Sequence, residues 1–333
     1  MFTSTIANEK NHKKRLMIKS AKLTPNRLAI IDLGTNSVRI DIYRLTGRKV
    51  IRVYRGKLMV RLGDGVFSTG KLSPIGMERT IRAFSQFRQL LLRKKVKKVI
   101  AFGTSALRTA TNSKEFLQRL KVQTGINVKV ISGKEEGQLI ALGVLANIEP
   151  PKGYYSLVDI GGGSTEISLC LGKKIIYSYS FQLGANRLQQ TFLKTIPPEF
   201  KRGQLHPILA LRQHLKSELH PFSQFCAKYQ IKMILGSSGT IRSIERIMEK
   251  AGRKRKNISR SAVSAFVSEL QTMNRVQIKK IPGLEEKRVD LILAGSILLE
   301  EIMFAVGTKK LAVTDLALRD GILERELAAN GTS

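Results

Sequence analysis

The 333-residue sequence contains no tryptophan and only two cysteines, Cys170 and Cys226, which lie far apart. Two distant cysteines provide neither a disulfide framework nor the paired spacing of a zinc site, and this pattern is typical of a reducing compartment. No apolar run reaches the roughly 18 residues that a membrane-spanning helix needs. We therefore expect a cytoplasmic protein without a membrane span.

Several catalytic signatures are also missing. No GxxxxGK[ST] loop occurs, and no GxGxxG motif opens a helix. The four histidines form no HExxH or comparable metal pair. Neither a Ser-His-Asp nor a Cys-His arrangement is suggested. A phosphate site in this chain must therefore be of another kind.

Acidic residues are scarce, with 25 Asp and Glu against 58 Lys and Arg, a formal net charge of +33. Such a surface attracts polyanions, whether nucleic acid, anionic membrane or polyphosphate. Aromatic residues are few and no nucleic-acid-binding motif occurs, so nucleic acid is expected to bind only non-specifically, through charge. Lysines that merely keep the protein in solution are the alternative, and charge alone does not decide.

Two basic segments stand out. The first 27 residues carry seven Lys or Arg against one Glu. We interpret residues 1–26 as a basic flexible tail, with a mitochondrial-type targeting segment as the alternative. The run at 253–256 is interpreted as an exposed loop, with a dedicated binding patch as the alternative.

One segment of the chain occurs twice. IIDLGTNS at 30–37 has a counterpart in LVDIGGGS at 157–164, with Asp, Gly and Ser repeated at a constant offset of 127 residues. Each copy begins as an apolar run and continues as alternating apolar and polar residues, which predicts strand, tight turn and strand. Two domains of one architecture are expected.

Helical and strand patterns fill the rest of the chain. Helical spacing is found at 77–91, 116–120, 135–146, 185–194, 206–219, 240–250 and 290–304, and short apolar runs at 99–102, 128–131, 233–235 and 311–313. The mixture predicts an α/β protein with helices packed on mixed sheets.

The repeated turns are candidate phosphate-binding loops. Consecutive glycines let backbone N–H groups converge on a phosphate, and neighbouring hydroxyls add donors. The candidates are Gly34, Thr35, Asn36, Ser37, Gly161, Gly162, Gly163, Ser164 and Thr165. Asp159 ends an apolar strand, where a carboxylate can hold a divalent cation. The alternative is a flexible turn with a solvated Asp. The repeat favours a paired clamp, in which each loop lies within a hairpin with no helix N-terminus behind it.

Three further loops could carry chemistry. In SGKEEG, Glu135 and Glu136 are candidate general bases, although acids at a helix N-terminus commonly complement the helix dipole. Arg108 in GTSALR could stabilise charge on a phosphoryl group or form a surface ion pair. The loop with Gly236, Ser238 and Gly239 could bind an anion or a nucleotide, or form a tight turn.

Seven blocks carry a family resemblance: IDLGTNS, GTSALRTATN, ISGKEEG, VDIGGGSTE, LGANRL, GSSGTI and TDLALRDGIL. In this order, over about residues 28–327, they resemble the exopolyphosphatase/guanosine pentaphosphate phosphatase (Ppx/GppA) family of the actin and sugar-kinase superfamily. The resemblance implies two actin-like (ribonuclease H-like) α/β domains with mixed sheets flanked by helices and an active site in the interdomain cleft. Domain I would comprise 27–137 and 317–333, and domain II 138–316.

The resemblance also implies roles for single residues. Glu136 matches the catalytic base, and Arg108 matches an arginine at the phosphate site. Asp159 and Glu166 match carboxylates tied to the metal and the attacking water, and Asp32 is a further metal candidate. The expected metal is Mg²⁺, with Mn²⁺ as an alternative, and a monovalent cation such as K⁺ is a further candidate.

The expected function is release of terminal orthophosphate from inorganic polyphosphate. Hydrolysis of guanosine pentaphosphate is the second choice, with guanosine tetraphosphate as a further partner. A phosphotransferase and a weakly catalytic regulatory protein that binds polyphosphate or alarmones stay open. Family resemblance suggests a homodimer and a two-domain member without extra helical domains. The chain has Gly137 where the family commonly has Ala, and Asp320 where it commonly has Glu.

Overall fold

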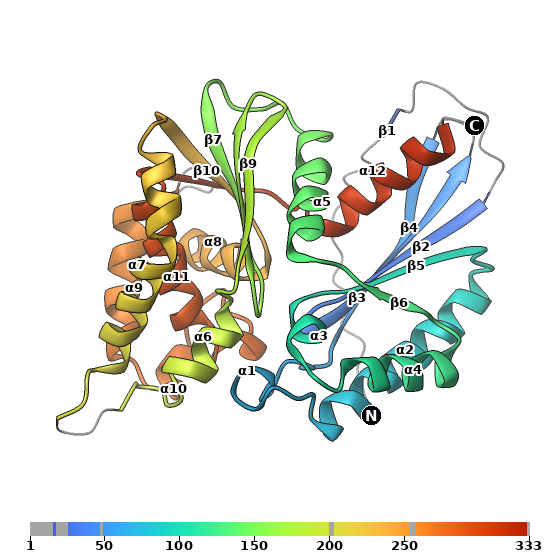
Figure 1. Ribbon diagram of the computed structural model, residues 1–333, viewed down its shortest axis with the longest axis horizontal. Coiled ribbons are helices and arrows are strands. Elements are labelled where there is room, and N and C mark those ends of the chain that lie inside the picture. The colour runs from blue at the N-terminus through green and yellow to red at the C-terminus, as the bar shows by residue number, and fades with distance from the viewer. Residues whose placement is uncertain (1–15, 18–25, 47–48, 200–202, 253–257, 332–333) are drawn as a thin grey trace.

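The computed structural model describes residues 16–17, 26–46, 49–199, 203–252 and 258–331. Within them the chain forms two lobes, each built on a mixed six-stranded sheet with helices on its faces (Figure 1). The α/β class predicted from the sequence is confirmed. No helix in the described part of the chain is long and apolar enough to cross a membrane.

The sheet of the first lobe has the strand order β1-β4-β3-β2-β5-β6. Its strands are β1 (Leu16–Met17), β2 (Asn26–Leu33), β3 (Ser37–Thr46), β4 (Lys49–Met59), β5 (Lys98–Gly103) and β6 (Val128–Val130). Its helices are α1 (Val66–Thr69), α2 (Pro74–Arg93), α3 (Ser105–Thr109), α4 (Ser113–Thr124), α5 (Gly133–Leu145) and, from the end of the chain, α12 (Leu318–Gly331).

The second lobe contains the order β11-β12-β10-β7-β8-β9. Its strands are β7 (Tyr154–Ile160), β8 (Thr165–Leu171), β9 (Lys174–Phe181), β10 (Ile231–Ser237), β11 (Ile258–Ser259) and β12 (Lys310–Val313). Its helices are α6 (Ala185–Phe192), α7 (Pro207–Cys226), α8 (Gly239–Lys250), α9 (Arg260–Thr272), α10 (Arg275–Lys279), the 3-10 helix η1 (Glu286–Arg288) and α11 (Ile292–Ala305).

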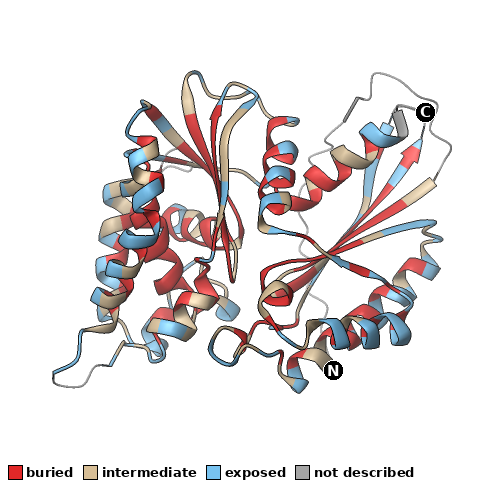
Figure 2. Cartoon of the chain, in the orientation of Figure 1, coloured by how far each residue is buried: buried red, intermediate tan, exposed pale blue. Residues whose placement is uncertain are grey.

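Both sheets are covered on two faces, as strand periodicity requires. In β2, Ile31 packs with Phe84 of α2 and Phe116 of α4, whereas the adjacent Ile30 packs with Ile140 of α5 and Ile322 of α12. Successive side chains of a strand point to opposite faces, so these apolar neighbours belong to separate cores. Figure 2 shows the buried residues concentrated along both sheets and along α11.

Helix α5 joins the two lobes. Its residue Ile140 belongs to the core of the first lobe, while Val144 packs with Tyr155 and Leu157 of the second. The domain boundary expected after residue 137 therefore falls within α5, and it stays a prediction. Residues 16–17 of the expected tail form β1, paired with β4. The remainder of 1–25 and the basic run at 253–256 lie outside the described residues.

Candidate active site

The two repeated turns face each other across a cavity of about 110 Å³ between the lobes. The β2–β3 turn is closed by a hydrogen bond from Gly34 N to Ser37 O (3.1 Å), and the β7–β8 turn by one from Gly161 N to Ser164 O (2.9 Å). The predicted residues that line the cavity are Asp32, Gly34, Thr35, Asn36, Ser37, Glu136, Asp159, Gly161, Gly162, Gly163, Ser164, Ser238 and Gly239.

The β7–β8 turn approaches the first lobe too closely for any side chain. A Cβ atom on Gly162 would lie 2.6 Å from Thr35 Cβ, and one on Gly163 would lie 2.5 Å from Ser105 Oγ. Real Cβ contacts are longer than this, so the loop must be glycine where it meets the other lobe. The glycines therefore serve close approach across the cleft.

Glu136 lies in the first turn of α5, which begins at the N-cap Ser132. The side chain is buried, and its Oε2 accepts a hydrogen bond from Arg108 Nη1 (2.7 Å). Arg108 also donates to Ile131 O (3.0 Å) and, across the cleft, to Ser164 Oγ (3.1 Å). Burial raises the pKa of Glu136 to about 7 although Arg108 opposes the rise. This carboxylate is thus suited to accept a proton near neutral pH.

Three other predicted carboxylates differ in their surroundings. Asp159 accepts a hydrogen bond from Ser237, and burial raises its pKa. Asp32 accepts a hydrogen bond from Arg319 (3.2 Å). Glu166 lies buried in β8, accepts from Ser180 Oγ (2.8 Å) and does not line the cavity. Burial raises its pKa well above the ordinary value.

These carboxylates bear on the expected metal. No group of three or more His, Cys, Asp or Glu that could hold a metal ion occurs among the described residues. Mg²⁺, however, commonly takes one or two carboxylates and completes its shell with phosphate oxygens and water. Asp32 and Asp159 line the cavity and supply such oxygens. The residues present therefore fit a magnesium ion that arrives with phosphate, and they do not form a complete protein cage.

Four predicted residues lie outside the cavity lining: Arg108, Thr165, Glu166 and Gly236. Arg108 reaches the site through Glu136 and Ser164, as described above. The Thr165 hydroxyl donates its proton to the backbone oxygen of Leu183, within the second lobe. The roles assigned to these four residues stay predictions.

The sequence analysis missed a group of cations in the same cavity. Arg39 of β3, Lys57 of β4, and Lys287 and Arg288 of η1 also line it. Burial, with repulsion from neighbouring cations, lowers the pKa of Arg39 and of Arg288 to about 10 and that of Lys57 to about 7. Cations crowded in this way are stabilised by an anionic ligand. The only sequence signal was the placement of Arg39 within the alternating strand that follows the first turn.

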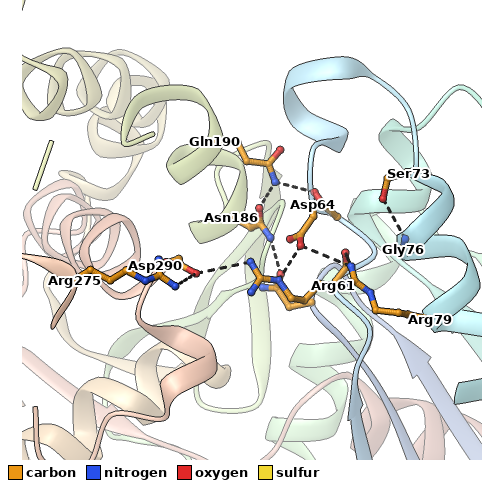
Figure 3. A network of polar contacts seen from close by, with 11 residues as sticks. Arg61, Asp64, Ser73, Gly76, Arg79, Asn186, Gln190, Arg275 and Asp290 are labelled. Atoms are coloured by element: carbon orange, nitrogen blue, oxygen red, sulfur yellow. Dashed lines mark hydrogen bonds and ion pairs between the residues drawn. The ribbon is translucent and has the colours of Figure 1, made fainter. Parts of the chain in front are cut away.

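Polar side chains join the lobes at one end of this cleft (Figure 3). Asn186 Nδ2 donates to Asn36 Oδ1 (2.6 Å), and Gln190 Nε2 donates to Gly63 O (2.8 Å). A second cavity here, lined by Asn36 and Asn186 among others, adjoins the first. The residues of α6 therefore bridge to the first lobe.

The chain matches the model of the Ppx/GppA phosphatase family over residues 42–330. It belongs to this family. The resemblance inferred from the seven sequence blocks is confirmed. Among curated relatives, Exopolyphosphatase 1 of Mycobacterium tuberculosis is 27% identical over 318 residues, which cover 92% of this chain and 90% of the relative.

Solved structures of the family share the fold. An exopolyphosphatase from Cytophaga hutchinsonii superimposes with a TM-score of 0.82 at 26% identity, covering 91% of this chain and 98% of the other. The Ppx/GppA family member of Aquifex aeolicus gives a TM-score of 0.74 at 28% identity, covering 93% and 100%. The two-domain fold implied by the sequence resemblance is confirmed.

Proposed function

We propose that this Ppx/GppA phosphatase is an exopolyphosphatase that releases terminal orthophosphate from inorganic polyphosphate. The observation that carries the proposal is the buried Glu136, with its pKa near neutrality and its hydrogen bond to Arg108, at a cavity lined by two glycine turns and four cations. Relatives named exopolyphosphatase span nine-tenths of the chain, in agreement.

In the proposed reaction, the terminal phosphoryl group binds between the two glycine turns. Glu136 orients a water molecule and accepts its proton as the oxygen attacks phosphorus in line with the leaving chain. Such general-base help is worth about 10²–10⁴ in rate. Arg108 holds the Glu136 carboxylate and hydrogen-bonds Ser164 of the facing turn, so base and phosphate site keep a fixed geometry.

Magnesium is the metal we propose. Asp159 and Asp32 would hold it, and when bound it would neutralise charge on the phosphate oxygens. Arg39, Lys57 and Arg288 supply further positive charge from both lobes. The transferring group is thus surrounded by fixed charge, which usually contributes more to phosphoryl transfer than the base does.

Inorganic polyphosphate fits the cavity better than a nucleotide. No aromatic residue is present among the described residues that line it, so a guanine base has no stacking partner there. The cations recognise phosphate groups whatever follows them. Hydrolysis of guanosine pentaphosphate is accordingly the second arm of the test.

The proposed compartment is the cytoplasm, because Cys170 and Cys226 are both free and buried. Thiols persist in this form in a reducing environment. The homodimer expected from the resemblance stays a prediction.

The test measures phosphate release from long-chain polyphosphate and from guanosine pentaphosphate, with Mg²⁺. Glu136→Gln removes the base and should lower kcat on polyphosphate by at least about 100-fold. Glu135→Gln is the matched control, because that adjacent carboxylate bonds Arg325 (2.9 Å) and does not line the cavity. Full activity of Glu136→Gln would refute the assignment of Glu136 as the general base. If phosphate were released from guanosine pentaphosphate alone, the nucleotide and not polyphosphate would be the substrate. Binding of both without hydrolysis would make the protein a sensor.

A further inference from the structure

The LGANRL block at 183–188 has no role in the mechanism above, yet it begins helix α6 directly behind the second glycine turn. Ala185 N donates to Gly161 O (3.0 Å), and Asn186 N donates to Gly162 O (2.8 Å). A helix N-terminus does therefore lie behind this turn, contrary to the sequence expectation. Its amides bind the carbonyls of the turn and not a ligand.

The third carbonyl of the turn is bound by a side chain. Arg187 Nε donates to Gly163 O at 2.8 Å. In a trans peptide the C=O and the following N–H point in opposite directions. Because α6 holds the carbonyls of three consecutive glycines, the N–H groups of Gly162, Gly163 and Ser164 point away from α6. These three residues also line the cavity, where amides that point away from α6 are available to bind an anion.

Backbone packing keeps this contact tight. A Cβ atom on Gly184 would lie 2.4 Å from Gly163 N and 2.5 Å from Gly162 C. No other residue fits between the turn and the start of α6 without displacing one of them.

Arg187 also reaches the first lobe. Its Nη2 donates to Thr109 Oγ1 (3.1 Å), at the end of the short helix α3 that carries Arg108. The guanidinium carbon stacks 4.3 Å from the ring centroid of Phe67 in α1. One guanidinium thus connects the glycine turn of the second lobe to the helix that carries Arg108 in the first.

We propose that Arg187 is a positioning residue. It fixes the anion-binding amides of 162–164 and sets their register against Arg108, and it does not touch the substrate. The expected effect of replacing Arg187 on the rate of hydrolysis rests on the proposed function, whereas its expected effect on anion binding does not.

The experiment compares Arg187→Met and Arg187→Lys with Arg119→Met, a control in α4 whose ion pair with Glu78 is solvent-exposed. Two readouts are taken: kcat and KM on polyphosphate, and calorimetric binding of tripolyphosphate to each variant combined with Glu136→Gln. We expect kcat of Arg187→Met to fall about 10- to 100-fold, because small misplacements of a site are this costly. KM for long-chain polyphosphate should change less than about threefold, since cations outside the turn still hold the rest of the chain. Tripolyphosphate has no such extension, so its binding should depend on the turn.

The conservative variant separates geometry from charge. Lysine keeps the charge but cannot bind Gly163 O and Thr109 Oγ1 with one rigid fork, so Arg187→Lys should stay at least about 10-fold below wild type. Recovery of full rate by lysine, or an unchanged kcat in Arg187→Met, would overturn the proposal.

Gly184→Ala gives an independent variant that alters no charge. It should weaken tripolyphosphate binding by displacing the turn, and Arg187→Met should weaken it too. If wild type binds tripolyphosphate but hydrolyses no polyphosphate, the proposed function fails, and loss of binding in these variants still supports the positioning role. Unchanged tripolyphosphate binding by folded Gly184→Ala would refute the positioning role.

Discussion

The Glu136 carboxyl group has its pKa raised to about 7, first by burial and then by the negative charges of Asp159 and Asp32, against the pull of Arg108. The charge of Glu136 in turn adds to the effect of burial in raising the pKa of Glu166 in β8. A base must be deprotonated to act, so kcat/KM should rise about tenfold per pH unit below pH ~7 and level off above it. A rate profile from about pH 5.5 to 9 measures this. A flat profile through pH ~6 would contradict the assignment.

The pKa of a second carboxylate, Asp41, is shifted in the opposite direction. Asp41 is fully buried, yet Arg319 and Arg55 lower its pKa to about 2 against the effect of burial. Removing one partner of a buried ion pair typically costs about 3–5 kcal/mol. Asp41→Asn should lower the free energy of unfolding at neutral pH by this amount, and Asp315→Asn, at a side chain 89% exposed, should not. Urea unfolding provides the measurement.

The pH dependence of this effect has a defined sign. The pKa of Asp41 is depressed from 3.8 to about 2, so its ion pairs stabilise the fold above the ordinary pKa. That contribution disappears as the pH falls from about 3.8 toward about 2. The stability difference between wild type and Asp41→Asn should therefore shrink in this window. A difference that persists unchanged below pH ~2 would show that the carboxylate charge is not its cause.

At the scale of elements, the predicted hairpins at 30–42 and 157–171 are confirmed as β2–β3 and β7–β8. They were predictable because these strands are buried on both faces and their apolar pattern is strong. Strands β4 and β9 were not predicted, since β4 buries only Val50 and β9 only Phe181. A strand with one buried residue has no hydrophobic period to detect.

The residues of the site also divide into those that the sequence predicted and those that it did not. The glycine turns and the SGKEEG segment were predictable because each is contiguous in the sequence. Arg39, Lys57 and Arg288 come from three separate elements, and only the folded chain brings them to one cavity. Arg187 was likewise part of a recognised block, but its contacts depend on the packing of α6 against the turn.

Helices α5 and α12 cross where two glycines meet. A Cβ atom on Gly321 would lie 1.7 Å from Leu139 O, and one on Gly143 would lie 2.4 Å from Gly321 N. Backbone atoms cannot move aside as a flexible side chain can, so the helices would have to separate. Gly321→Ala should therefore destabilise the protein by about 3 kcal/mol.

The matched control for this substitution is Gly172→Ala. Gly172 has open space around its Cα but a positive φ of 55°. Its replacement should cost only the left-handed backbone penalty, about 1 kcal/mol. Thermal and urea unfolding of both variants provide the comparison. If Gly321→Ala were no less stable than Gly172→Ala, α5 and α12 would be able to separate at little cost in free energy of unfolding.

At the scale of the whole molecule, the two lobes surround a small cavity while the chain carries a net charge of +33. A cavity of about 110 Å³ is filled by few phosphate groups. A long polyphosphate must therefore extend from it over the protein surface, where it meets solvated cations. Attraction between such charges reaches about 30 Å at 0.01 M salt but only about 8 Å at 0.15 M.

This difference predicts a dependence of salt sensitivity on chain length. Between these two salt concentrations, KM for long-chain polyphosphate should rise at least about tenfold, and KM for tripolyphosphate less than about threefold. The value of kcat should stay constant, because the groups around Glu136 are buried and weakly screened. Initial rates at fixed free Mg²⁺, with tetramethylammonium chloride as a second salt, separate screening from a specific effect of K⁺. Equal salt sensitivity for both substrates would confine binding to the cavity, and the net charge would then have no part in holding the chain.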